Sequence, residues 1–179
     1  MNVKKELSGH RSVQVEVEVP GSTQSAVARR SAEAQLRTLI AKFAPAHLRL
    51  IGAMRRWLRK RLPAAHEVVY EYRDFFVISY SPNERGYEGV LGIRASADGV
   101  QLFFNRCKEL PDPAKLLQGS GSQCRSIDLD GASTLARPEV ARLIHEAIAH
   151  NPVPFARAGR GSVVVRSTSA EKRRQRRPA

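Results

Sequence analysis

The order of the predicted secondary structure constrains the fold of this chain more than any single motif does. Segments with strand patterns follow one another through the middle of the sequence, and helical segments lie before and after them. The strand-like segments are rich in β-branched and aromatic residues or end at turn signals. They cover 67–81 (one bent strand or two short ones), 89–95, 100–105 and 123–129, with a last short strand at 163–165. Strands in a run favour an α+β fold, in which an antiparallel sheet packs against helices.

Helical periodicity marks the flanking segments. A first helix begins near Ala32, and a second lies between Pro45 and Leu62. A third covers 138–150, and 110–117 has a short helical pattern after two prolines. Apolar residues at helical spacing give the first two helices their core faces, and these are Leu36, Leu39, Ile40 and Phe43, then Leu50, Ile51, Met54, Trp57 and Leu58.

The chain divides into three predicted parts. Residues 32–166 carry the core-forming patterns, 1–31 form an N-terminal arm and 167–179 a disordered basic tail. Within the arm, 12–19 reads SVQVEVEV, a strand pattern that can pair with a sheet edge or belong to a mobile arm. We favour the mobile arm, because a lone strand cannot stabilise itself.

Positive charge is concentrated in two places. The chain carries a net charge of +13. The stretch 37–61 holds eight basic residues and no acid, and 157–179 holds eight basic residues against Glu171 alone. Such concentrated fields attract phosphates and other anions.

The remaining composition indicates a globular cytoplasmic protein. No apolar run approaches the ~18 residues of a membrane-spanning helix, and the basic N-terminus is followed by no apolar signal segment. Cys107 and Cys124 have the spacing of neither a disulfide framework nor a metal knuckle, so we expect reduced thiols.

Four segments carry a resemblance to a known family: 43–72, 90–105, 109–129 and 137–150. The most specific is ELPDPAKLLQGSGSQCRSIDL, at 109–129. With them, the region from Phe43 to Arg166 resembles the YdhG-like family, also called domain of unknown function 1801. The resemblance implies an α/β sandwich with helices on an antiparallel sheet, in a frataxin-like arrangement. One branch of that family is described as an intracellular iron chaperone.

Catalytic and metal-binding patterns do not stand out. The histidines lack ligand spacing, and the second helix carries no carboxylate for a metal such as iron. We therefore expect no enzyme, no cofactor and no metal site. The glycine-rich segment at Gly119 and Gly121 can offer backbone N–H groups to an anion. Arg125 can assist it or pair with a neighbouring acid such as Asp128.

The basic tail gives the clearest functional signal. Its cations suit sequence-independent phosphate contacts, and they are Lys172, Arg173, Arg174, Arg176 and Arg177. We expect a non-enzymatic binding protein that contacts nucleic acid or another polyanion through this tail, and no membrane. The alternative is a carrier of a small ligand or of iron, as the resemblance implies.

Overall fold

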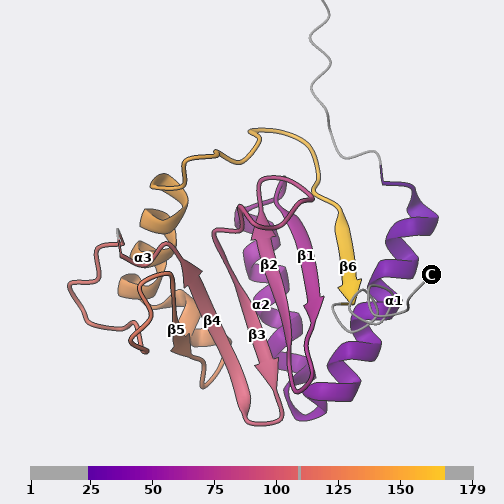
Figure 1. Cartoon of the computed structure of the whole chain (residues 1–179), viewed down its shortest axis with the longest axis horizontal. Coiled ribbons are helices and arrows are strands. Elements are labelled where there is room, and N and C mark those ends of the chain that lie inside the picture. The colour runs from indigo at the N-terminus through magenta and orange to yellow at the C-terminus, as the bar shows by residue number, and fades with distance from the viewer. Residues whose placement is uncertain (1–23, 109, 168–179) are drawn as a thin grey trace, which may run out of the picture.

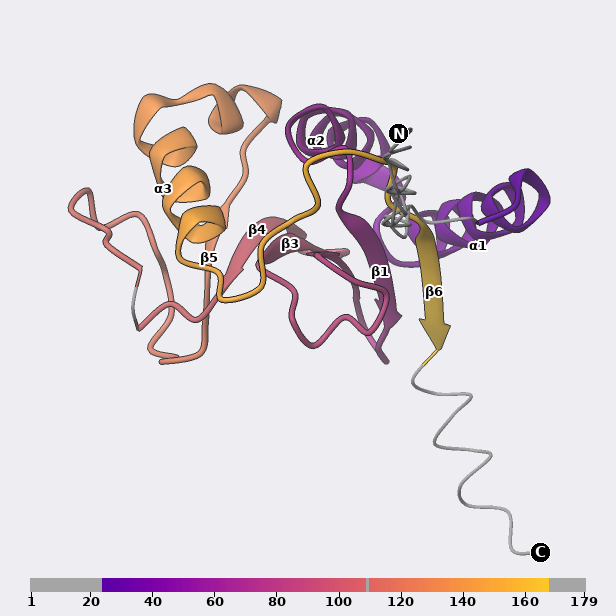
Figure 2. The ribbon, with the colours of Figure 1, turned by 90° about the horizontal axis from the view of Figure 1, so that it is seen from above.

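Three α-helices lie on one face of a six-stranded sheet in the computed structural model, which describes residues 24–108 and 110–167 (Figures 1 and 2). The helices are α1 (Ala26–Phe43), α2 (Leu48–Arg61) and α3 (Pro138–Ala149), with single 3₁₀ turns at Pro45–His47 and Ala132–Ala136. The strands are β1 (His66–Glu71), β2 (Phe76–Ser81), β3 (Leu91–Ser96), β4 (Gly99–Asn105), β5 (Cys124–Asp128) and β6 (Val163–Ser167). The predicted α+β class, with a sheet packed against helices, is confirmed.

The sheet is mixed, not wholly antiparallel. Its strand order is β5-β4-β3-β2-β1-β6, and the first five strands in the sequence pair as antiparallel neighbours. After α3 the chain crosses to the opposite edge, where β6 runs parallel to β1 (Figure 1). The long crossover replaces a hairpin, and only such a connection allows parallel pairing.

The core lies between the helices and one face of the sheet. A row of aliphatic side chains crosses all six strands in register and joins the hydrophobic core. The row consists of Val165, Val69, Ile78, Ile93, Leu102 and Ile127. From the helices, Leu36, Ile51, Met54 and Leu58 are fully buried against it. Burying each such side chain stabilises the fold by about 1.5–3 kcal/mol.

Two helical predictions need correction. Helix α1 begins at Ala26, where the Ser25 side chain accepts a hydrogen bond from the Ala28 N–H, and so includes residues assigned to the arm. Its first turns are exposed and carry no apolar residues at helical spacing, so the sequence pattern did not predict them. The segment 110–117 is not helical, because the Asp112 carboxylate accepts the N–H groups of Leu116 and Leu117 and holds a turn instead. The possible strand at 12–19 lies outside the described residues.

A side chain covers the outer edge of the last strand. The amide of Gln24 donates a hydrogen bond to the Val163 carbonyl at 2.7 Å and accepts one from the Val163 N–H at 3.1 Å. Gln24 therefore satisfies the backbone groups that β6 turns away from β1 at this position.

A buried ionic network fastens α1 and α2 to the sheet. Glu67 of β1 is 1% exposed and accepts two hydrogen bonds from Arg55 of α2, while the Tyr80 hydroxyl donates a third. Arg55 also donates two hydrogen bonds to Glu33 of α1, and Arg59 a further one. The carboxylates outweigh the cost of burial and raise the pKa of Arg55, so the guanidinium stays charged.

The 37–61 cluster is therefore not one binding surface. Arg55 and Arg59 point inward to carboxylates, and Lys42 pairs with Glu71. Arg61 stacks on the Trp57 ring. The other four cations of the cluster make no ion pair with a described residue, and they are Arg37, Arg49, Arg56 and Lys60.

Candidate functional site

The face of the sheet opposite the helices carries arginine and aromatic side chains. Figure 2 shows the helices on one face of the sheet. Because side chains alternate between the two faces of a strand, the row next to the aliphatic one points away from the helices. In order from β6 to β5, this row consists of Arg166, Tyr70, Val77, Arg94, Gln101 and Asp128. Two arginines thus flank a tyrosine and a valine across four neighbouring strands.

A hollow of about 410 Å³ opens on this face. The loop between β2 and β3 forms one wall, and the end of β4 forms the other. The lining contains aromatic and amide side chains together with one arginine and, among the described residues that line it, no acid. The lining includes the side chains of Tyr70, Ser79, Tyr87, Asn105, Arg106 and Gln123.

Two glycines allow the hollow to form. Gly86 has a φ of +86°, and a Cβ there would lie 1.9 Å from the Tyr70 hydroxyl, so only glycine lets the loop rest on the sheet. At Gly92 of β3 a Cβ would lie 2.5 Å from the Phe103 ring. The ring of Phe103 therefore lies across β3 and forms an apolar floor beside Ser79, the residue paired with Gly92.

From Tyr72, which also lines the hollow, aromatic rings and an arginine stack on one another. The rings of Tyr72 and Phe75 are 4.6 Å apart and nearly parallel, and the Arg94 guanidinium lies 4.3 Å from the centre of the Phe75 ring. Arg94 also donates a hydrogen bond to the Gln101 side chain, which donates one to Asp128. Stacking on a ring fixes the direction of a guanidinium without neutralising it.

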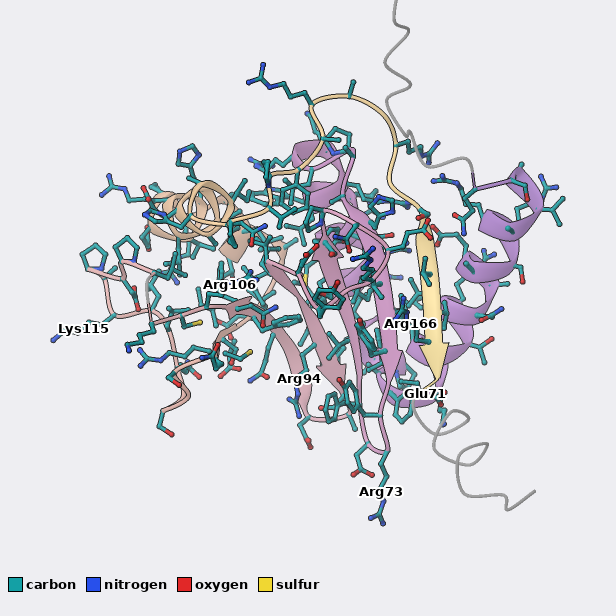
Figure 3. All side chains as sticks on the ribbon, turned by 45° about the horizontal axis from the view of Figure 1, so that its top comes forward. Glu71, Arg73, Arg94, Arg106, Lys115 and Arg166 are labelled. Carbon is teal, nitrogen blue, oxygen red and sulfur yellow. The ribbon has the colours of Figure 1, made fainter. Side chains whose placement is uncertain are left out.

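The two other arginines on this face bind neutral oxygens. Arg166 donates a hydrogen bond to the backbone carbonyl of Glu84, and Arg106 donates one to the Asn151 side chain. No ion pair joins Arg94, Arg106 or Arg166 to a described carboxylate. Arg106 also has a φ of +55°, an uncommon conformation for a residue other than glycine. Figure 3 labels the three arginines, of which Arg94 belongs to β3, Arg166 to β6 and Arg106 to the segment that follows β4.

The structure does not bring the predicted glycine-loop residues into this hollow. Gly119 and Gly121 are exposed on the long loop between β4 and β5, and no atom lies within 4 Å of a Cβ placed on Gly119. Arg125 donates its Nε–H to the Gly121 carbonyl at 2.9 Å, while Asp128, the suggested partner, binds Gln101. Arg125 shares the side of β5 that carries buried Ile127, away from the uncovered face. The predicted tail cations, 172–174 and 176–177, lie outside the described residues.

The arginines and tyrosines of the sheet were not predicted as site residues. Arg94 is an isolated cation in an apolar strand, and Arg166 is one of the eight cations in the basic stretch 157–179. The signal that could have found them is the strand period, which places them on the face opposite Ile93 and Val165. Their alignment into one row depends on strand pairing, which the sequence does not give.

Outside the hollow, the Cys107 thiol and the pair of His66 and Ser162 involve buried groups, which do not favour catalysis. Cys107 is buried, and burial raises the pKa of its thiol, which opposes thiolate chemistry. His66 Nδ1 lies 2.7 Å from the Ser162 hydroxyl, but Ser162 is only 1% exposed. Among the described residues no group of three or more His, Cys, Asp or Glu could hold a metal ion.

These features define the chain as an α+β domain whose sheet is open on one face. No family model, curated protein or solved structure matches the chain. The YdhG-like and frataxin-like resemblance therefore stays a prediction. No helix in the part of the chain described has both the length and the apolar character to span a membrane.

Proposed function

We propose that this protein is a non-enzymatic nucleic-acid-binding protein that uses the uncovered face of its sheet together with its basic tail. The observation that carries the proposal is the row in which Arg166 and Arg94 flank Tyr70 and Val77. Arginines supply phosphate contacts, and aromatic side chains on a sheet supply flat surfaces for bases.

The spacing and direction of the arginines support a strand-shaped ligand. Arg166 and Arg94 are separated by three inter-strand spacings, about 14 Å. Arg106 lies at the hollow, beyond the end of β4. Three cations spread along one face suit a chain of phosphates better than a single anion.

The tail adds charge next to β6 in the sequence. Strand β6 carries Arg166 and ends at Ser167, and the basic segment 168–179 follows it directly. The predicted tail contacts and the sheet face can therefore act on one ligand, with the tail contributing the sequence-independent part.

Fluorescence anisotropy with labelled oligonucleotides at two salt concentrations tests this function. The double variant Arg94→Ala/Arg166→Ala should bind at least tenfold more weakly, and the slope of log affinity against log salt should fall by about 0.7 for each phosphate of a single strand that is no longer neutralised. The matched control is Arg49→Ala/Arg56→Ala, which removes the same charge from the exposed side of α2. Equal weakening in both variants would show that binding depends on net charge and not on the sheet face. Undetectable binding at low salt would refute the proposal.

The hollow itself supports the alternative, a small-ligand carrier. Its volume of about 410 Å³ falls in the range of small-molecule pockets. The iron-carrier form of the alternative gains no support from the described residues, which group no set of metal ligands. Calorimetric titration with ferrous and ferric iron distinguishes it: heat of binding above the buffer signal would favour a metal carrier over the nucleic-acid function.

A further inference from the structure

We infer that the hollow on the sheet holds an unpaired base, so that the ligand of this face is single-stranded nucleic acid. The inference rests on the proposed function and specifies its substrate class. It is carried by the polar atoms and rings that the hollow presents, not by the charge around it.

Ser79 is the most informative group in the hollow. Its residue is 4% exposed and lines the hollow, and its hydroxyl makes no hydrogen bond with any described residue. Gly89 packs directly over it, since a Cβ on that glycine would lie 2.1 Å from the Ser79 oxygen. Buried hydroxyls in folded proteins nearly always have a partner, so this one is available to a polar ligand atom.

Two amides complete the polar lining. Asn105 donates its N–H to the Gly89 carbonyl at 2.7 Å, which leaves its side-chain oxygen as an acceptor toward the hollow. Gln123 is exposed and makes no hydrogen bond within the described residues, so it offers a donor and an acceptor. Together with Ser79, these side chains match the mixed donors and acceptors on the edge of a base.

The rings provide the apolar sides that a flat base needs. Tyr87 stands at the rim and is 68% exposed, and Tyr70 forms part of the wall. Phe103 forms the floor across β3. A base inserted among these rings replaces the stacking that it loses on leaving its neighbours.

A duplex cannot use these groups. Paired bases are stacked on their neighbours and their hydrogen-bonding edges face one another, whereas the bases of a single strand can turn outward onto a protein. The hollow is concave and lies between Arg106 on one side and the row of Arg94 and Arg166 on the other. A single strand can place one base in it and its flanking phosphates on the arginines.

The test compares three probes of equal length: oligo-dT, a hairpin duplex and an abasic strand that has phosphates but no bases. We expect the oligo-dT to bind at least tenfold more tightly than the other two. Tyr87→Ala should lower its affinity about tenfold and leave the abasic strand unaffected, while Tyr87→Phe, which keeps the ring, should retain the affinity. Leu48→Ala, at an exposed apolar residue on the helical side, is the control for surface truncation.

Photo-crosslinking gives a second readout that does not depend on the folding of a variant. A 4-thiothymine in the single strand should crosslink to a peptide that contains Tyr70 or Tyr87. Equal affinity for the abasic strand and the oligo-dT would overturn the inference and leave the proposed function in place. Failure of all three probes to bind would overturn both.

Discussion

The Nη2 atom of Arg55 lies 2.6 Å from Oε2 of Glu67, and Arg55 Nε lies 3.1 Å from Oε1 of the same carboxylate. This bidentate pair joins α2 to β1 inside the protein, where Glu67 is almost fully shielded from solvent. The neighbouring Arg56 is exposed and has no ion pair with a described residue. Adjacent arginines of one helix thus have different roles.

Replacing Arg55 by Ala should therefore destabilise the protein strongly. The substitution leaves Glu67 charged, buried and without its main partner, which costs about 3–5 kcal/mol of unfolding free energy. Chemical denaturation followed by circular dichroism measures the change. Arg56→Ala is the matched control and should change the unfolding free energy by less than about 0.5 kcal/mol. Similar values for the two variants would show that the buried pair does not hold the helix.

Stability should fall in acid because of Glu33. Burial alone would raise the pKa of its carboxyl, but hydrogen bonds and charges from Arg55 and Arg59 outweigh burial and hold the pKa below 4.5. The unfolded chain therefore takes up this proton at a higher pH than the folded chain does. The stabilisation is complete above the unfolded pKa and is lost as the pH falls through the lowered folded value.

Denaturation at a series of pH values from 6 down to 3 measures this effect. Glu33→Gln removes the titrating group, so the variant should lose less stability than the parent chain below pH 4.5. The same acid slope in both proteins would assign the effect to other carboxyls.

Gly86→Ala should disturb both stability and binding. The left-handed φ costs a residue with a Cβ about 1–2 kcal/mol, and the new methyl would meet the Tyr70 hydroxyl, so the loop must lift from the sheet. Gly119→Ala is a matched control, because its φ is also positive, at +99°, but its Cβ meets no atom within 4 Å. We expect both variants to lose stability and only Gly86→Ala to lose affinity for oligo-dT. Unchanged affinity in Gly86→Ala would separate the loop from the binding surface.

The tail should set the salt dependence of binding. Replacing the five basic residues of 172–177 by Gln keeps the length of the chain, and the salt slope should fall by about 0.7 for each phosphate of a single strand that these residues neutralise. The preference for oligo-dT over the abasic strand should persist, since it depends on the hollow. If the tail variant kept the salt slope but lost the preference for oligo-dT over the abasic strand, the tail would select the base and would not set the salt dependence.

The predictable part of the fold is the part that local periodicity encodes. Leu36, Ile40 and Phe43 are buried as their helical spacing requires, and β3 pairs with β4 across a short turn. The position of β6 was not predictable, because three valines at 163–165 suit any edge or interior place in a sheet. The candidate site was also not predictable, because its residues come together only through strand pairing and none of them is unusual within its own segment.

The charge pattern of 37–61 wrongly indicated a uniformly basic surface. The cluster at 37–61 reads as uniformly basic, but the carboxylates that neutralise Arg55 lie outside it in sequence, at Glu33 and Glu67. A helix tells which face a cation occupies, and only tertiary packing tells which acid meets it.

The parallel pairing of β1 with β6 has a consequence for folding on the ribosome. These strands bring together residues nearly a hundred positions apart, since Glu67 of β1 pairs with Val163 of β6. Until residues 163–167 have been synthesised, β1 is an edge strand with unpaired backbone groups. An incomplete chain therefore exposes a template for pairing with other chains, and the pairing of β6 with β1 removes it.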